Sequence, residues 1–202
     1  MVKVTQRLTR EDWILAGFRA LVAGGAGALR VEPVARALGA TKGSFYWHFS
    51  DPADWRTAML VYWKDAAFSR IVSGLNLLPK GEARLQALAL IAATGARDPS
   101  HGGAAGEPAL RDWARYDPGV ADALRWVDAE RLRFVAECFR DAGLERSAAG
   151  QAARLFYAAY IGLQSMGAPA GVDGADLARL IDALTGALTG ALTGAGAGSA
   201  TA

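Results

Sequence analysis

Apolar residues along the chain recur with the spacing of helices, and no segment alternates apolar and polar residues for long. The first apolar positions that share one helical face are Ile14, Phe18, Leu21 and Val22. They follow Thr9 and Asp12, whose spacing of three residues is that of a capping box at a helix start. A first helix is therefore predicted from Thr9 to the glycine cluster at 24–27.

Two short helices are predicted next, separated by a sharp turn. The first extends from about Glu32 to Leu38, with Pro33 in its first turn, where the missing N–H costs nothing. Gly39 is expected at its end in the left-handed backbone conformation. The second begins at its capping residue Thr41 and extends to about His48. Helix, glycine turn and helix together have the geometry of a DNA-reading helix-turn-helix.

The remainder of the chain is also predicted to be helical, so the fold class is all-α with about nine helices. Asp51 and Pro52 open a fourth helix as a cap and a first-turn proline, and Gly74 can end it. Later helices are predicted near 82–96, 109–116, 120–142, 148–166 and 173–188. The helix at 148–166 is apolar nearly all round, which suggests a partner subunit, because such a helix must be covered on all sides.

A repeat of Leu-Thr-Gly-Ala with a period of four residues follows from position 184. A glycine in each repeat costs a helix roughly 1 kcal/mol relative to alanine. We therefore expect the last helix to fray after about Leu188 and residues 191–202 to form a disordered tail.

Charge is distributed unevenly along the 202 residues, although the net charge is only +2. Residues 1–64 hold nine Lys and Arg against five Asp and Glu, whereas the remainder is slightly acidic. A basic N-terminal part favours a polyanionic partner. An ordinary solvated surface is the alternative explanation.

Composition and motifs argue against several other classes of protein. With one cysteine, Cys138, and two histidines, the chain offers no disulfide and no metal site. Glycine-rich phosphate loops, dinucleotide motifs and nucleophile elbows are absent, so neither an enzyme nor a cofactor is expected. The N-terminus has no signal-peptide pattern, and the charge-free run 155–172 contains Pro169, which favours a buried helix over a membrane span. A cytoplasmic protein without a membrane partner is expected.

The second short helix carries the candidate DNA contacts. The residues at its start, small or long enough to reach base edges in a major groove, are Lys42, Gly43 and Ser44. The aromatic side chains that follow are Phe45, Tyr46, Trp47, His48 and Phe49. One helical turn cannot bury all five, so some polar-tipped rings are expected to face outward, where their donors suit phosphate oxygens. An aromatic turn within the core is the alternative.

The run from Leu38 to Phe49, Leu-Gly-Ala-Thr-Lys-Gly-Ser-Phe-Tyr-Trp-His-Phe, together with Val34-Ala35, resembles the TetR family of transcriptional regulators. The close match covers about residues 9–64, and the remainder resembles the family in layout. The DNA contacts that this resemblance implies are Thr41, Lys42, Gly43, Ser44, Tyr46, Trp47 and His48. It also implies a homodimer through the helices near 120–142 and 148–166, a palindromic operator and a small-molecule inducer.

The resemblance further implies a helix-turn-helix domain at 1–50, linked by helix four at 51–74 to a ligand-binding and dimerisation domain at 75–190. The expected function is that of a homodimeric repressor that an inducer releases from DNA, although an activator on the same scaffold would look alike. The amphipathic aromatic residues proposed to line the inducer pocket are Trp113, Tyr116, Trp126, Tyr157 and Tyr160. Core and dimer packing is the alternative role for each. Arg131 and Arg133 could bind a carboxylate or form ion pairs.

One departure from the family pattern concerns the start of helix four. Family members usually carry a lysine there that grips a phosphate, and this chain has Pro52, flanked by Asp51 and Asp54. Arg56 is the candidate for a compensating cation. A small-molecule-binding or interaction protein that kept the helical fold but lost sequence-specific DNA reading is therefore the alternative function.

Overall fold

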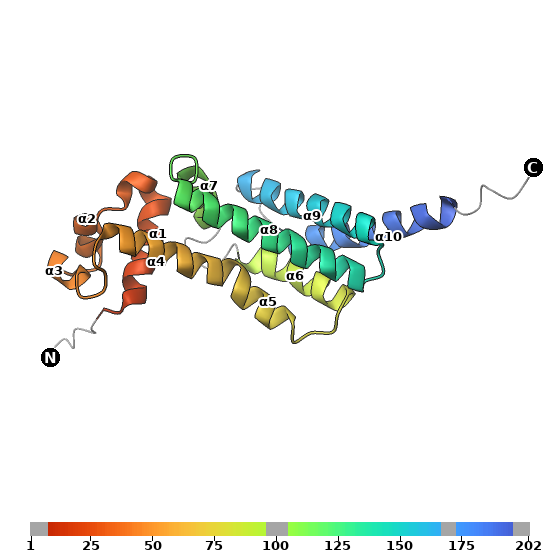
Figure 1. Cartoon of the computed structure of the whole chain (residues 1–202), viewed down its shortest axis with the longest axis horizontal. Coiled ribbons are helices and arrows are strands. Elements are labelled where there is room, and N and C mark those ends of the chain that lie inside the picture. Colours follow the sequence, from red (N-terminus) through yellow and green to blue (C-terminus); the bar gives the residue numbers. More distant parts are fainter. Residues whose placement is uncertain (1–7, 96–104, 167–172, 196–202) are drawn as a thin grey trace, which may run out of the picture. The chain divides into compact units, whose positions relative to one another are not determined.

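The computed structural model describes residues 8–95, 105–166 and 173–195, and within these ranges every regular element is a helix (Figure 1). The α-helices are α1 (Arg10–Gly24), α2 (Val31–Ala37), α3 (Lys42–Phe45), α4 (Pro52–Lys64), α5 (Arg70–Leu75), α6 (Glu82–Gly95), α7 (Gly106–Trp113), α8 (Pro118–Asp141), α9 (Arg146–Met166) and α10 (Gly174–Ala195). A 3₁₀ turn, η1 (Ala26–Ala28), and a π-helical turn, η2 (Asp65–Ser69), complete the set. The predicted all-α class is confirmed.

The chain divides into two compact units. The first comprises Met1–Ala66 and Asp98–Leu124, and the second comprises Ala67–Arg97 and Arg125–Ala202. In the described part of the chain, no helix is both long and apolar enough to cross a membrane.

Helix α1 begins with the predicted capping box. The Thr9 hydroxyl accepts a hydrogen bond from the Asp12 backbone N–H, and the Asp12 carboxylate accepts one from the Thr9 backbone N–H at 2.7 Å. Of the four residues predicted to form the buried face, Val22 is exposed. It lies at the edge of the apolar stripe in the last turn, next to the glycine cluster that ends the helix.

An aromatic cluster forms the core of the first unit around Phe45. The Phe45 ring centroid lies 5.4 Å from that of Trp13, 5.1 Å from that of Phe49 and 5.6 Å from that of Trp55. All four side chains are buried, and the Trp55 indole N–H donates to the Trp13 carbonyl at 3.1 Å. Because these residues come from three helices and a turn, the cluster fixes the short α3 against α1 and α4.

The single helix predicted from 51 to 74 is interrupted by a π-helical turn. α4 ends at Lys64, the turn η2 follows, and α5 ends at Leu75. A π-helical turn is a rare variant of helix. The sequence of this turn, Asp-Ala-Ala-Phe-Ser, contains no proline or glycine that would indicate an interruption. Within the second unit, the Arg131 Nε donates to the Ala67 carbonyl of this turn at 3.2 Å.

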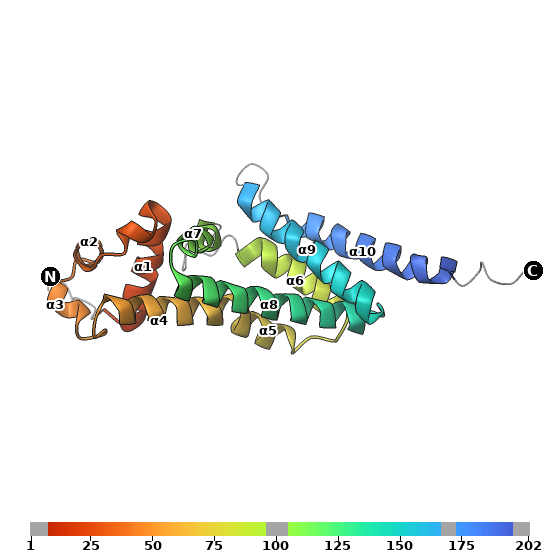
Figure 2. The same ribbon diagram turned by 45° about the horizontal axis from the view of Figure 1, so that its top comes forward.

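The core of the second unit is built from α5, α6, α8, α9 and α10. Figure 2 shows α6, α9 and α10 side by side, and α10 packs on both of the other helices. Its fully buried centre includes Leu75, Leu85, Cys138, Phe139, Ala149, Ala152, Leu177 and Ile181. Burial raises the pKa of the Cys138 thiol to about 11, which agrees with the role of a small apolar core residue.

The bounds of α7 and α10 also differ from those predicted. α7 begins at Gly106, before the predicted start at 109, because Glu107-Pro108 provides its first turn. α10 continues to Ala195, beyond the predicted end near Leu188, because leucine and alanine are strong helix formers that outweigh the glycines. Residues 196–202 of the predicted tail lie outside the described residues.

Candidate DNA-binding site

The turn between α2 and α3 has the predicted geometry. Gly39 has a φ of 65°, in the left-handed region that favours glycine. The Gly39 N–H donates to the Arg36 carbonyl at 3.1 Å, and the Ala40 N–H donates to the Ala35 carbonyl at 2.8 Å. This pair of bonds is a Schellman motif, which ends α2 and redirects the chain within two residues.

Helix α3 begins as predicted but is shorter. The Thr41 hydroxyl accepts a hydrogen bond from the Ser44 N–H at 3.2 Å and so caps the helix. The prediction that this helix extends to His48 is wrong, because α3 ends at Phe45 and a tight turn follows. In that turn the His48 N–H bonds to the Phe45 carbonyl at 2.9 Å, three residues back, while the buried Phe45 ring holds the segment in place.

The aromatic residues of this segment divide into a buried pair and an outward-facing group. Phe45 and Phe49 are buried, whereas the side chain of Tyr46 is 48% exposed and that of Trp47 is 82% exposed. His48 is half-buried. The alternative of an aromatic core turn therefore holds for the two phenylalanines and fails for Tyr46 and Trp47.

A shallow hollow of about 340 Å³ lies on the outer side of this segment. Its lining residues are Leu8, Thr41, Gly43, Ser44, Trp47 and His48. The structure thus brings five of the seven candidate DNA contacts to one surface. Lys42 and Tyr46 belong to the same segment and are exposed beside it.

Lys42 forms an ion pair that the sequence analysis missed. Its ammonium nitrogen lies 2.6 Å from a carboxylate oxygen of Glu32, which stands in the first turn of α2. This hydrogen bond holds the pKa of Glu32 below its ordinary value and raises the pKa of Lys42. The two residues are ten positions apart, so helical spacing alone could not have paired them.

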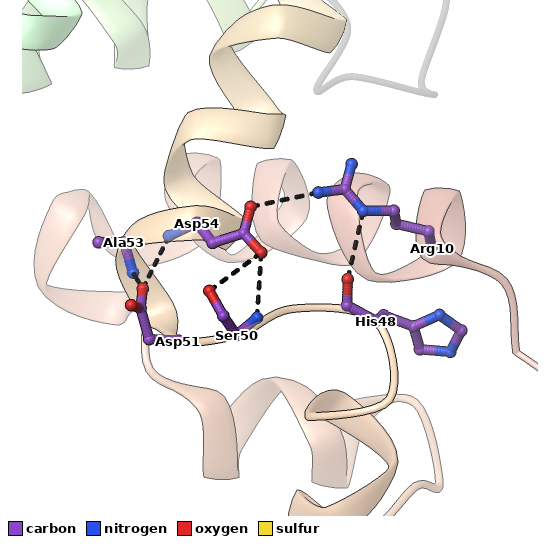
Figure 3. A network of polar contacts seen from close by, with 6 residues as sticks. All are labelled: Arg10, His48, Ser50, Asp51, Ala53 and Asp54. Atoms are coloured by element: carbon purple, nitrogen blue, oxygen red, sulfur yellow. Dashed lines mark hydrogen bonds and ion pairs between the residues drawn. The ribbon is translucent and has the colours of Figure 1, made fainter.

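The two aspartates around Pro52 are engaged in hydrogen bonds inside the first unit (Figure 3). Asp51 caps α4, because its carboxylate accepts hydrogen bonds from the Ala53 N–H at 2.7 Å and the Asp54 N–H at 2.8 Å. The Asp54 carboxylate accepts from the Ser50 N–H at 3.0 Å. The two carboxylates therefore stabilise the start of α4 and the turn before it.

Arg10 is a cation at this site that the sequence pattern did not indicate. Its Nη2 lies 3.3 Å from an Asp54 carboxylate oxygen, and its Nε donates to the His48 carbonyl at 3.3 Å (Figure 3). The guanidinium also lies 4.6 Å from the centre of the Phe49 ring. Helix α3 and the turn after it, residues 42–49, are here called the α3 segment. Arg10 thus connects the start of α1 to the end of the α3 segment and to the start of α4.

The five aromatic residues proposed as ligand contacts do not form one cluster. Trp113 is buried and Tyr116 is exposed, and both belong to the first unit. In the second unit, Trp126 meets Phe68 edge-on with ring centroids 5.7 Å apart. Tyr157 and Tyr160 stack with ring centroids 6.1 Å apart.

Arg131 connects the Tyr157–Tyr160 pair to its surroundings in the second unit. Its guanidinium carbon lies 5.9 Å from each tyrosine ring, and its Nη1 lies 3.1 Å from the Tyr157 hydroxyl. That hydroxyl donates to Asp128 at 2.7 Å. Arg133, in contrast, forms an ion pair with Glu130 on the same helix, as the ion-pair alternative predicted.

Comparison with known proteins identifies the N-terminal segment. Residues 14–53 match the family model described as bacterial regulatory proteins, tetR family. This match contains α2, α3 and the turn between them, together with most of α1. No curated protein matches the sequence.

Solved structures of regulators share the fold at low sequence identity. A transcriptional regulator from Rhodococcus sp. Rha1 matches with a TM-score of 0.69 and 20% identity over 91% of this chain and 97% of that chain. A putative TetR-family regulator from Mesorhizobium loti matches with a TM-score of 0.66 and 22% identity over 93% of this chain and 98% of that chain. A putative transcriptional regulator from Saccharomonospora viridis, solved in complex with choline, matches with a TM-score of 0.69 and 17% identity. The match covers 86% of this chain and 93% of that chain. Residues 14–53 therefore match the family model of the TetR family of bacterial regulatory proteins, and the chain shares the fold of solved TetR-family regulators.

Proposed function

We propose that this protein is a sequence-specific DNA-binding transcriptional regulator that reads a palindromic operator as a homodimer. The observation that carries the proposal is the α3 segment, which a buried aromatic cluster fixes while its outer face stays open to solvent. Lys42, Gly43 and Ser44 stand at the N-terminal end of α3, the end that a recognition helix offers to base edges.

The local shape of α3 suits close approach to DNA. A Cβ atom added at Gly43 would meet only the Thr41 hydroxyl, at 3.7 Å, so the backbone here is unobstructed. The Tyr46 hydroxyl, the Trp47 indole N–H and the His48 ring offer donors for phosphate oxygens or an apolar contact for thymine methyl groups.

We further propose a division into a helix-turn-helix domain at 1–50, the linking helix at 51–74, and a ligand-binding and dimerisation domain at 75–190. Homodimer formation through α8 and α9 is supported by the exposed side of α9. From Leu155 onward this side carries uncharged residues, namely Leu155, Ala158, Gly162, Ser165 and Met166. A second copy of the chain would cover them. A cytoplasmic location fits such a regulator.

A repressor released by a small-molecule inducer is the mode of action that we propose. An inducer that binds one conformation of the dimer better than another would shift the population of the DNA-binding state. Support comes from the choline complex of the Saccharomonospora viridis regulator and from the stacked Tyr157–Tyr160 pair beside Arg131. Among the five aromatic candidates, this pair is the first to test. Mass spectrometry of compounds that co-purify with the protein would identify the inducer, which should then release the operator in a binding assay.

Selection of random DNA duplexes on the purified protein tests DNA reading. The expected result is a reproducible palindrome whose half-sites lie about one helical turn apart, roughly 34–36 Å. Lys42→Ala should weaken binding to the selected operator by about tenfold to a hundredfold. Lys80→Ala removes the same charge from an exposed position in the second unit and should leave affinity unchanged. A failure to select any palindrome would favour the alternative function, a small-molecule-binding or interaction protein without sequence-specific DNA reading.

A further inference from the structure

The ion pair between Glu32 and Lys42 joins the two helices of the helix-turn-helix on their solvent-facing side. Glu32 stands in the first turn of α2, and Lys42 is the first residue of α3. The Gly39 turn brings them together, with the ammonium nitrogen 2.6 Å from the carboxylate oxygen. Each side chain is slightly more than half exposed, so both charged groups remain open to an incoming ligand.

The ion pair between Glu32 and Lys42 contributes little to the stability of the fold. Exposed ion pairs are screened by water and salt and contribute little to the free energy of unfolding. The aromatic cluster around Phe45 already fixes α3 without it. The pair instead places a negative and a positive charge side by side beside the residues that we propose to face DNA.

The chemistry of the two groups is complementary in a specific way. An ionised carboxylate can only accept hydrogen bonds, and an ammonium group can only donate them. Glu32 is ionised at neutral pH as an ordinary glutamate is, and the hydrogen bond from Lys42 lowers its pKa further. Phosphate oxygens are acceptors, and a carboxylate therefore gains nothing from them. In the major groove, by contrast, the amino group of cytosine is a donor that a carboxylate recognises.

A G·C base pair presents the matching pattern at its major-groove edge. Guanine offers two acceptors, N7 and O6, beside the donor N4 amino group of its cytosine partner. We propose that Glu32 and Lys42 read one G·C base pair in each operator half-site as a unit. Lys42 donates to guanine, and Glu32 accepts from cytosine. This inference rests on the proposed DNA-reading function and adds Glu32 as a specificity-determining residue.

A second consequence concerns DNA of random sequence. On such DNA, Lys42 can keep its ion pair with Glu32 and make no phosphate contact. If Lys42 instead binds a phosphate, the unpaired Glu32 carboxylate is repelled by the negatively charged DNA. Glu32 therefore weakens non-specific binding and widens the gap between operator and random DNA. Removing the carboxylate should free Lys42 for one more phosphate contact, which steepens the salt dependence of binding by about one in the log–log slope.

Duplex selection with wild-type protein, Glu32→Gln and Glu32→Ala tests the inference. The wild-type operator should contain a G·C pair at one position of each half-site, and its replacement by another pair should cost about tenfold to a hundredfold in affinity. In both variants the preference at this one position should fall to a few-fold while the other positions keep theirs. Binding to random duplexes should tighten several-fold. Glu82→Gln, an exposed carboxylate in the second unit, is the matched control.

The double variant Glu32→Ala, Lys42→Ala shows whether the two residues act together. If they read one base pair, the double variant should discriminate at that position no worse than either single variant. Circular dichroism and thermal unfolding verify that each variant folds. Because Glu32 is replaced in two different ways, a folding defect in one variant leaves the other to test the inference.

Two outcomes overturn the inference while leaving the proposed function intact. One is an unchanged base preference in both Glu32 variants, and the other is a Glu32-dependent position that prefers A·T. If wild-type protein selects no motif, and Lys42→Ala binds every duplex as wild type does, the proposed function fails and the inference fails with it.

Discussion

Gly17 lies on α1 where side chains of α4 pack directly against the helix. A Cβ atom added there would lie 2.6 Å from the Met59 sulfur and 2.8 Å from Trp55 Cζ2. Met59 could move its flexible end, but Trp55 is buried and its indole N–H is bonded to Trp13, so its ring cannot yield. The absence of a side chain at Gly17 is thus a packing requirement of the first unit.

Gly17→Ala is therefore expected to lower the free energy of unfolding by about 1–3 kcal/mol, the usual cost of overpacking a core. Urea unfolding followed by circular dichroism measures it. Gly27→Ala is the matched control, because a Cβ atom at Gly27 meets nothing within 4 Å and should change stability by less than about 0.5 kcal/mol. Equal effects of the two substitutions would show that α1 and α4 do not pack in this way.

In the proposed DNA-binding role, Arg10 positions the α3 segment through its contacts and reads no base itself. It holds the His48 carbonyl and the Asp54 carboxylate, so its loss should loosen the α3 segment relative to α4. Arg10→Gln is expected to weaken binding to all duplexes by a similar factor, about tenfold, and to preserve the base preferences. Competition binding on the selected operator and its single-base variants measures both quantities.

The matched control for Arg10 is Arg179→Gln, which removes an exposed arginine from an ion pair on α10. It should leave DNA affinity unchanged. A narrowed or altered base preference in Arg10→Gln would mean that this arginine contacts bases, and an unchanged affinity would mean that its contacts do not position the segment.

At the scale of elements, the capping box of α1 links the stability of this helix to pH. Hydrogen bonds from the Thr9 backbone N–H and hydroxyl lower the pKa of Asp12 below its ordinary value of 3.8. A lowered carboxyl pKa means that the ionised form stabilises the folded state. This contribution is complete above the ordinary pKa and disappears as the pH falls through the lowered value.

Asp12→Asn is accordingly expected to lower the free energy of unfolding at pH 7 by about 0.5 kcal/mol, a modest figure because the box is exposed. The difference from wild type should shrink as the pH falls below about 4, since the protonated aspartate then resembles the amide. Chemical unfolding of both proteins between pH 3 and pH 7 tests this. A difference that stays constant over that range would contradict a charge-dependent cap.

The start and end of most helices could be predicted because their signals are local. Thr9 with Asp12, Gly39, and Asp51 with Pro52 each define a boundary through residues within a few positions of it. The early end of α3 depends instead on the burial of Phe45 among distant aromatic rings. The π-helical turn η2 likewise has no marker in the sequence of its own five residues.

In the candidate DNA-binding site, too, local features could be predicted from the sequence and long-range contacts could not. Outward-facing Tyr46 and Trp47 could be predicted, because one turn has too little room to bury five aromatic rings. The partners of its charged residues could not, since Glu32 is ten positions from Lys42 and Asp54 is 44 positions from Arg10. Such pairs depend on how the chain folds back on itself, which residue spacing does not encode.

At the scale of the whole molecule, the basic excess of residues 1–64 takes on a clearer meaning. Of the five acidic side chains in that part, Asp12 and Asp51 cap helices, and Asp54 bonds to Ser50 and Arg10. Three of the five negative charges are thus committed to local structure, and Glu32 is paired with Lys42. The electrostatic attraction for the proposed DNA partner is therefore better judged from which charges remain accessible than from the net charge.

The proposed homodimer makes a prediction that only the assembled molecule can test. Leu155 is 49% exposed on the uncharged side of α9, and a charge at this position would oppose its burial in an interface. Leu155→Glu should convert a dimer into a monomer in sedimentation equilibrium. It should also weaken operator binding by more than a hundredfold, because a monomer loses the high effective concentration of its second reading head. Leu77→Glu places the same charge at an 87% exposed position and should change neither property. A Leu155→Glu protein that remains dimeric would exclude this side of α9 from the interface, and a monomer with full operator affinity would show that DNA reading does not need the dimer.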